Sequence, residues 1–212
     1  MSWFDLPRRP EPEVMDDSSE VQAYSSAAAD AYLKGLERRR AAGLDLKVHS
    51  VASLFVSRWD VATAVALPVD LRNRVGIAVA ADAYAASCAL ADSERVAELA
   101  DAGAPFQRLL FASTGTKDPA ASDTLYVSNL VAPGTVNTMP DSTLLAFADH
   151  GEIPALLDPE GVAADDALTA ISAAGVDLSE LAERLQREGK DAFVASWTAL
   201  LATVEEKAGR AR

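Results

Sequence analysis

Hydroxyl and cationic side chains follow three short apolar stretches of this sequence. The first stretch leads into Ser57 and Arg58, the second into residues 113–117 (Ser-Thr-Gly-Thr-Lys), and the third into Asn137 and Thr138. Arginine and lysine, together with hydroxyl and backbone N–H donors, are the groups that bind a phosphate monoester. If the three stretches are neighbouring strands, these side chains lie at one phosphate-binding edge.

The first of these stretches has the composition of a buried β-strand. We expect strands at Leu46–Ser57, Gln107–Thr114 and Thr135–Met139, and Leu46–Ser57 is apolar at most of its positions. That pattern is typical of parallel strands that are covered on both faces. In parallel α/β folds, ligands bind at the C-terminal ends of the strands. The sequence therefore predicts a binding site where the polar residues follow the strands.

Helical segments separate and follow the predicted strands. We expect helices from Ser18 or Ser19 to Ala42, from Asp70 to Ala102 and from Asp123 to Val131, another starting near Asp141, and three after Glu160 with breaks at Gly175 and Gly189. This alternation predicts parallel strands joined by helical crossovers. Three strands are too few for a closed (β/α) barrel, which needs eight strand–helix units and about 250 residues.

Composition excludes several classes of function. The 212 residues carry a net charge of −13, which repels nucleic acid and anionic membranes and is otherwise typical of a soluble protein. The single cysteine, Cys88, rules out an intrachain disulfide and suits a reducing cytoplasm, and we expect it to be buried. Residues 1–18 are predicted to be a flexible N-terminal arm without the apolar run of a signal peptide.

Other catalytic centres find little support in the sequence. With only two histidines and no clustered carboxylates, we expect no metal, and without a glycine-rich nucleotide loop we expect no cofactor. His49 is interpreted as a core residue of the first strand, and His150 as the end of a helix before Gly151. Two residues at the phosphate-binding edge also have simpler interpretations. Arg58 can pair with Asp60 or a helix end, and Lys117 can lie in an exposed turn.

The same segments resemble a known family, the transaldolases of the actinobacterial type. The similar segments are residues 51–58 (VASLFVSR, the sixth strand of that family), 112–119 and 122–127 (ASTGTKDP and SDTLYV, the seventh strand and its loop), 131–140 (VAPGTVNTMP, the eighth), 148–151 (ADHG), and the closing helices including Phe193–Leu200. The resemblance covers roughly residues 19–205. It implies that residues 19–210 form the C-terminal half of a TIM-type (β/α) barrel, helix-rich, with about three parallel strands and additional C-terminal helices.

The resemblance also implies a set of substrate-binding residues: Ser53, Phe55, Arg58, Ser113 and Lys117. In this interpretation Arg58 binds the phosphate of the sugar and Lys117 adds a second positive charge. The similar segments start at the sixth strand of the family. The Schiff-base lysine of the family lies on its fourth strand, and the catalytic carboxylates lie on the first and third. The resemblance therefore assigns no catalytic residue to this sequence. The substrate-facing asparagine of the fifth strand is replaced by the polar run Glu11–Ser19.

Five lysines remain in the sequence: Lys34, Lys47, Lys117, Lys190 and Lys207. Of these, only Lys117 lies at the predicted edge. Its polar surroundings favour phosphate binding over service as the reactive amine, which must be desolvated.

The resemblance implies transfer of a three-carbon dihydroxyacetone unit between sugar phosphates such as fructose 6-phosphate, in the cytoplasm. The expected enzyme is a transferase that takes its Schiff-base lysine from a second chain. Either this partner or a homo-oligomer covers the open strand edges. Two alternatives stay open. One is a non-catalytic sugar-phosphate-binding or scaffold module, and the other is a stand-alone enzyme of specialised sugar metabolism that uses Lys117.

Overall fold

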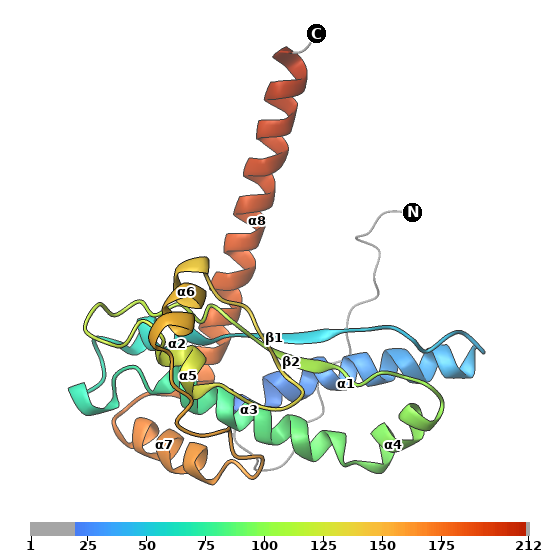
Figure 1. Cartoon of the computed structure of the whole chain (residues 1–212). Helices are drawn as coiled ribbons and strands as arrows, with labels where there is room; N and C mark the ends of the chain where they lie inside the picture. Colours follow the sequence, from blue (N-terminus) through green and yellow to red (C-terminus); the bar gives the residue numbers. More distant parts are fainter. Residues whose placement is uncertain (1–19, 211–212) are drawn as a thin grey trace.

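A small parallel sheet lies at the centre of the molecule. The computed structural model describes residues 20–210, so the predicted arm at residues 1–18 lies outside the described residues. Strands β1 (Val51–Phe55), β2 (Arg108–Ala112) and β3 (Val136–Asn137) pair in parallel in the order β1-β2-β3. Figure 1 shows this sheet among helices. The predicted helix-rich α/β class with three parallel strands is confirmed, whereas the barrel stays a prediction.

Eight α-helices and one short 3₁₀ helix are found in residues 20–210: α1 (Glu20–Ala41), α2 (Val56–Thr63), η1 (Val69–Leu71), α3 (Val75–Ala91), α4 (Glu94–Asp101), α5 (Leu125–Asn129), α6 (Asp141–His150), α7 (Val162–Ala173) and α8 (Leu178–Arg210).

The expected helix from Asp70 to Ala102 is two helices rather than one. The Ser93 side chain accepts a hydrogen bond from the Val96 N–H and so caps the start of α4. The sequences before and after Ser93 are both rich in alanine, so composition alone does not predict that one helix ends and another begins there.

The predicted helix break at Gly189 is wrong, because α8 runs through it. A glycine within a helix costs only about 1 kcal/mol relative to alanine. Helix α8 passes close to α2 at this glycine, since a Cβ at Gly189 would lie 3.2 Å from Nη1 of Arg58. The break at Gly175 is confirmed, because its φ of +94° follows the end of α7.

The strands are shorter than predicted, and this changes the position of two residues. β1 begins at Val51, so His49 precedes it and is exposed, which contradicts its interpretation as a core residue. The chain turns into helix directly after Phe55, so Ser57 lies in α2 rather than on the strand, and Arg58 follows it in the first turn of that helix.

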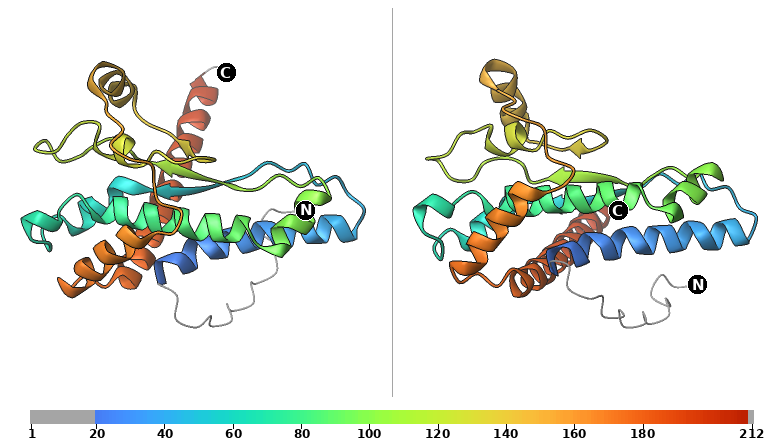
Figure 2. Two further views of the ribbon diagram at one scale, coloured as in Figure 1. Left: turned by 60° about the horizontal axis from the view of Figure 1, so that its bottom comes forward. Right: turned by 90° about the horizontal axis from the view of Figure 1, so that it is seen from below.

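Helix α3 forms the centre of the hydrophobic core. Figure 2 shows it between the sheet and α7. Val75 and Val79 pack with Trp59, Ile171 and Leu181 on one side. On the other side, a second cluster joins α3 to the strands; it contains Val56, Ala80, Ala83, Tyr84, Leu109, Phe111, Tyr126 and Leu130, and the partly buried Cys88 packs against it.

The segment Val69–Ala91 is long and apolar enough to cross a membrane by length and composition alone. Val75 and Val79 are completely buried in the core, however. The hydropathy of this segment therefore fits a helix inside a folded domain.

A buried carboxylate connects the start of α3 to two other elements. Asp60, which is 4% exposed, accepts hydrogen bonds from the backbone N–H groups of Val75 (2.9 Å) and Gly76 (3.2 Å) and from the hydroxyl of Tyr126 (2.9 Å). The positive end of the α3 dipole favours a carboxylate at this position. The carboxylate of Asp60 therefore forms its hydrogen bonds with α3 and α5. The ion pair between Arg58 and Asp60 that the sequence suggested is not among the contacts of the described residues.

Burial raises the pKa of Asp60, while its hydrogen bonds to Tyr126, Gly76 and Val75 act in the opposite direction. Burial, followed by the neighbouring Asp60, raises the pKa of Tyr126. Gly76 is required at this junction, because a Cβ there would lie 2.5 Å from the carbonyl oxygen of Val56.

We predict that Asp60→Ala lowers the free energy of unfolding by more than about 2 kcal/mol, since it leaves two N–H groups and one hydroxyl unpaired in the core. Urea unfolding monitored by circular dichroism measures this change. Asp70→Ala is the matched control, because Asp70 is exposed, and a change within about 0.5 kcal/mol is expected there. Equal effects of the two substitutions would contradict the role assigned to Asp60.

Candidate functional site

Two serines meet where the first two strands end. The N–H of Ser57 donates a hydrogen bond to the carbonyl oxygen of Ser113 (3.1 Å), and the two side-chain hydroxyl oxygens lie 2.8 Å apart. Ser113 adopts a φ of +57°, a conformation that is uncommon for residues other than glycine. The polar side chains after β1 and β2 therefore meet at one edge of the sheet, as the parallel strand order predicts.

Arg58 is held by an aromatic ring and by a distant helix. Its guanidinium carbon lies 4.3 Å from the centre of the Phe55 ring, which is the geometry of a cation–π contact. Because Gly189 has no side chain, α8 passes close to the same guanidinium group. These two contacts restrict the directions in which Arg58 can point.

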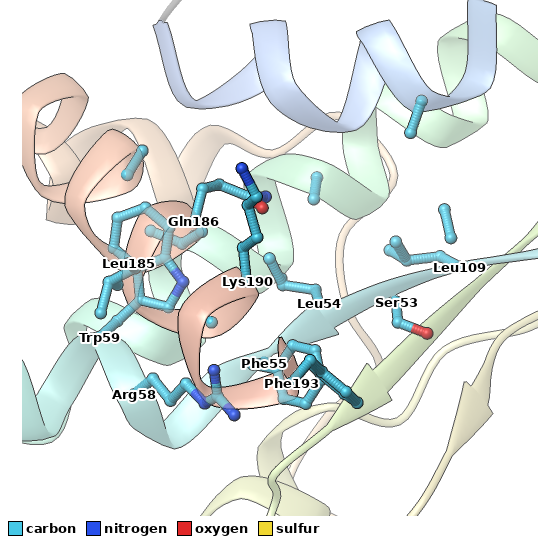
Figure 3. Close-up of a pocket in the computed structure, with 16 residues that line it drawn as sticks. Ser53, Leu54, Phe55, Arg58, Trp59, Leu109, Leu185, Gln186, Lys190 and Phe193 are labelled. Carbon is cyan, nitrogen blue, oxygen red and sulfur yellow. The ribbon is translucent and has the colours of Figure 1, made fainter. Parts of the chain in front are cut away.

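A cavity of about 360 Å³ extends along β1, between that strand and helices α1, α2, α3 and α8. Its walls contain three of the predicted substrate-binding residues, namely Ser53, Phe55 and Arg58. Figure 3 shows Arg58 at one end of this cavity, while Gln186 and Lys190 of α8 point toward α1. The cavity thus has two basic side chains, which come from α2 and α8.

Sequence reasoning missed the contribution of α8. Gln186, Lys190 and Phe193 line the cavity, but Lys190 was not placed at the predicted edge. Because a helix break was expected at Gly189, the sequence did not indicate that a continuous helix passes close to Arg58 there. The motif that includes Phe193 was the one available signal, and it did not identify the lysine three residues before it.

Ser113 and Lys117 do not line this cavity. Ser113 still contacts Ser57, the neighbour of Arg58, whereas Lys117 is exposed in a loop. The loop is fixed on both sides of Lys117. The hydroxyl of Thr116 donates to the carbonyl oxygen of Ser122 (2.7 Å), and the side-chain amide of Asn73 donates to Asp118 (2.7 Å). The bond from Asn73 is also the main reason that the pKa of Asp118 is lowered.

The third strand is joined to the same edge by Thr114. Its hydroxyl oxygen lies 2.8 Å from both the side-chain oxygen of Asn137 and the carbonyl oxygen of Thr138. Thr114 is completely buried. The polar residues after β2 and β3 therefore stabilise the edge of the sheet rather than line the cavity.

No group of three or more His, Cys, Asp or Glu side chains within the described residues is arranged to hold a metal ion. Most residues that line the cavity are apolar, but Arg58 and Lys190 can each bind an anionic group, and the serine hydroxyl and glutamine amide on its walls can donate or accept hydrogen bonds.

Comparison with known proteins identifies the family. The family described as Transaldolase/Fructose-6-phosphate aldolase matches residues 19–204. The chain belongs to this transaldolase family. It is 48% identical to a transaldolase of Thermobifida fusca over 192 residues, which cover 85% of this chain and 52% of the relative. It is 49% identical to transaldolase 1 of Streptomyces coelicolor over 186 residues, which cover 82% of this chain and 48% of the relative.

The resemblance inferred from the motifs is thus confirmed. The chain spans about half the length of the curated relatives that it matches. Family membership is therefore established for this transaldolase segment, while the activity of the complete relatives has to be argued separately.

A histidine connects the end of α6 to the loop that precedes α5. His150 lies 2.9 Å from Asp123 through Nε2 and 3.2 Å from Asp149 through Nδ1. Its place at the end of α6 is as predicted. Asp123, and then Asp149, raise the pKa of His150 above its ordinary value of 6.5.

Because the pKa of His150 is raised in the folded state, its protonated form stabilises the fold. This contribution is fully present below the unfolded-state pKa and is lost as the pH rises through the folded-state pKa. We predict that His150→Gln lowers the melting temperature at pH 5.5 and has a smaller effect at pH 8.5. Thermal melts of both proteins across this range measure the difference. A difference that does not change with pH would contradict the assignment.

Proposed function

We propose that this chain contributes the phosphate-binding half of a transaldolase, which transfers a three-carbon dihydroxyacetone unit between sugar phosphates. The observation that carries the proposal is the position of Arg58. Its guanidinium is directed by Phe55 and lies in a cavity with Lys190, in a chain of the transaldolase family. We further propose that the three strands belong to a TIM-type barrel.

The phosphate of the sugar binds Arg58 in this proposal. A guanidinium offers parallel N–H donors that match two phosphate oxygens, and such charge-assisted bonds are stronger than neutral ones. The hydroxyl of Ser53, on the same cavity wall, is available to a hydroxyl group of the sugar. Lys190, rather than the predicted Lys117, supplies the second positive charge of the cavity.

The covalent step needs an amine that attacks the ketone of the sugar and a carboxylate that transfers protons. Lys117 suits this role poorly, because it is exposed to water rather than desolvated. We propose that a second protein chain supplies the lysine and the carboxylate. The outer edges of β1 and β3 pair with no further strand within the described residues, which supports an additional chain at the sheet. The acidic surface and the single cysteine fit a cytoplasmic enzyme.

A non-catalytic sugar-phosphate-binding module is the second candidate. It is supported by the position of Ser53, Phe55 and Arg58 of this chain in one cavity. In this candidate function, the chain binds the sugar phosphate and takes no part in covalent chemistry.

We predict that Arg58→Ala raises the dissociation constant for fructose 6-phosphate by more than about tenfold, because it removes a charge-assisted hydrogen bond. Isothermal titration calorimetry on the full chain measures this effect. Arg74→Ala is the control, since Arg74 is exposed and outside the cavity. An unchanged dissociation constant for Arg58→Ala would exclude this phosphate site.

Borohydride reduction separates the catalytic proposals. The chain, together with any protein that copurifies with it, is incubated with fructose 6-phosphate and sodium borohydride, and the intact masses are measured. We expect the reduced adduct on the copurifying chain. An adduct on this chain that Lys117→Arg abolishes would instead support the stand-alone enzyme. Phosphate binding without any adduct would support the non-catalytic module.

A further inference from the structure

The second half of α8 stands apart from the rest of the protein. Figure 1 shows it projecting away from the sheet and the other helices. Every side chain from Asp191 to Arg210 is exposed. We call residues 191–210 the α8 arm.

The α8 arm has an apolar face that is largely exposed within the described residues, although Phe193 at its start also lines the cavity beside β1. Phe193, Trp197, Leu200 and Val204 are each 52–65% exposed. They are separated by four, three and four positions, which places them in a single row along the helix. Val194 and Leu201, which are 56% and 45% exposed, lie beside this row.

This face is unusual for a surface helix. Ala192–Val204 contains no charged residue and measures about 20 Å along the helix axis. Contiguous apolar patches of several hundred Å² on soluble proteins mark sites of interaction. The side chains of the apolar face expose roughly 600 Å², given the size of these residue types.

We propose that the α8 arm pairs with the α8 arm of a second copy of this chain in an antiparallel arrangement. The spacing of four, three and four reads the same in both directions along the helix. An antiparallel pair related by a two-fold axis therefore places Phe193 opposite the partner's Val204. The same axis places Trp197 opposite the partner's Leu200. A self-complementary patch of this kind is what a two-fold dimer requires.

The area of the face is sufficient for this dimer. Two copies bury roughly 1,200 Å² in total, which is the lower end of the range for specific interfaces. The resulting contact is expected to be in the micromolar range rather than permanent, since the affinity also depends on the entropy lost in association.

Charge also favours the α8 arm as the point of contact. The whole chain carries a net charge of −13, so two copies repel each other overall. The α8 arm is nearly neutral, because it has three acidic and two basic residues: Asp191, Glu205, Glu206, Lys207 and Arg210. The uncharged stretch between Asp191 and Glu205 is the part of the arm at which two acidic molecules approach without this repulsion.

Sedimentation equilibrium of the full chain at about 1–200 µM tests the proposal. We expect a monomer–dimer equilibrium that Trp197→Lys weakens by at least a hundredfold. Val65→Lys is the matched control, since Val65 is apolar and 96% exposed but lies outside the α8 arm; its dimer should match that of the wild type. Circular dichroism verifies that both variants are folded, and Leu200→Lys serves as a second disruptive variant.

Hydrogen exchange provides an independent readout. We expect protection of the amides of residues 192–204 to increase with protein concentration in the wild type and not in Trp197→Lys. A protein that is monomeric at 200 µM would overturn the proposal. A dimer that is weakened by neither Trp197→Lys nor Leu200→Lys would also overturn it. Association of the α8 arm with a different protein only would overturn it as well. None of these measurements uses a sugar phosphate, so their outcome is independent of the proposed function.

Discussion

The hydrogen bonds of one buried carboxylate organise both the fold and the cavity. Asp60 lies two residues after Arg58 and accepts bonds from the start of α3 and from Tyr126 in α5. Because α2 follows β1 and α5 follows the loop after β2, this single side chain joins the segments that leave two neighbouring strands. Its desolvation is costly, and the three donors offset that cost only in this arrangement of the helices.

The parallel register of β1 and β2 also determines which residues meet beside the cavity. Phe55 is paired with Ala112, so the residues that follow the two strands come into contact, and Ser57 meets Ser113. The abrupt change from strand to helix after Phe55 turns Arg58 onto the face of that ring. Rigid backbone elements thus position the guanidinium, which is what recognition of a phosphate requires.

Much of this could be predicted from the sequence, and the failures share a cause. The order of the elements, the parallel strands and the role of Arg58 as a candidate follow from local patterns and motifs. The contribution of Lys190 does not, because it depends on α8 crossing next to β1, a contact between residues far apart in the chain. Gly189 was misinterpreted for the same reason. It lies within a continuous helix and close to the guanidinium group of Arg58, and local preference cannot distinguish such a glycine from a helix break.

Helix α8 is continuous from Leu178 to Arg210, so one rigid rod forms a wall of the cavity and continues as the exposed α8 arm. Thermodynamic linkage follows from this continuity. If the paired and unpaired states of the arm differ even slightly in the tilt of α8, they differ in affinity for the ligand, and the ligand shifts the pairing equilibrium by the same factor. Protein concentration would then act as an effector of ligand binding, transmitted along a single helix without any change in the sheet.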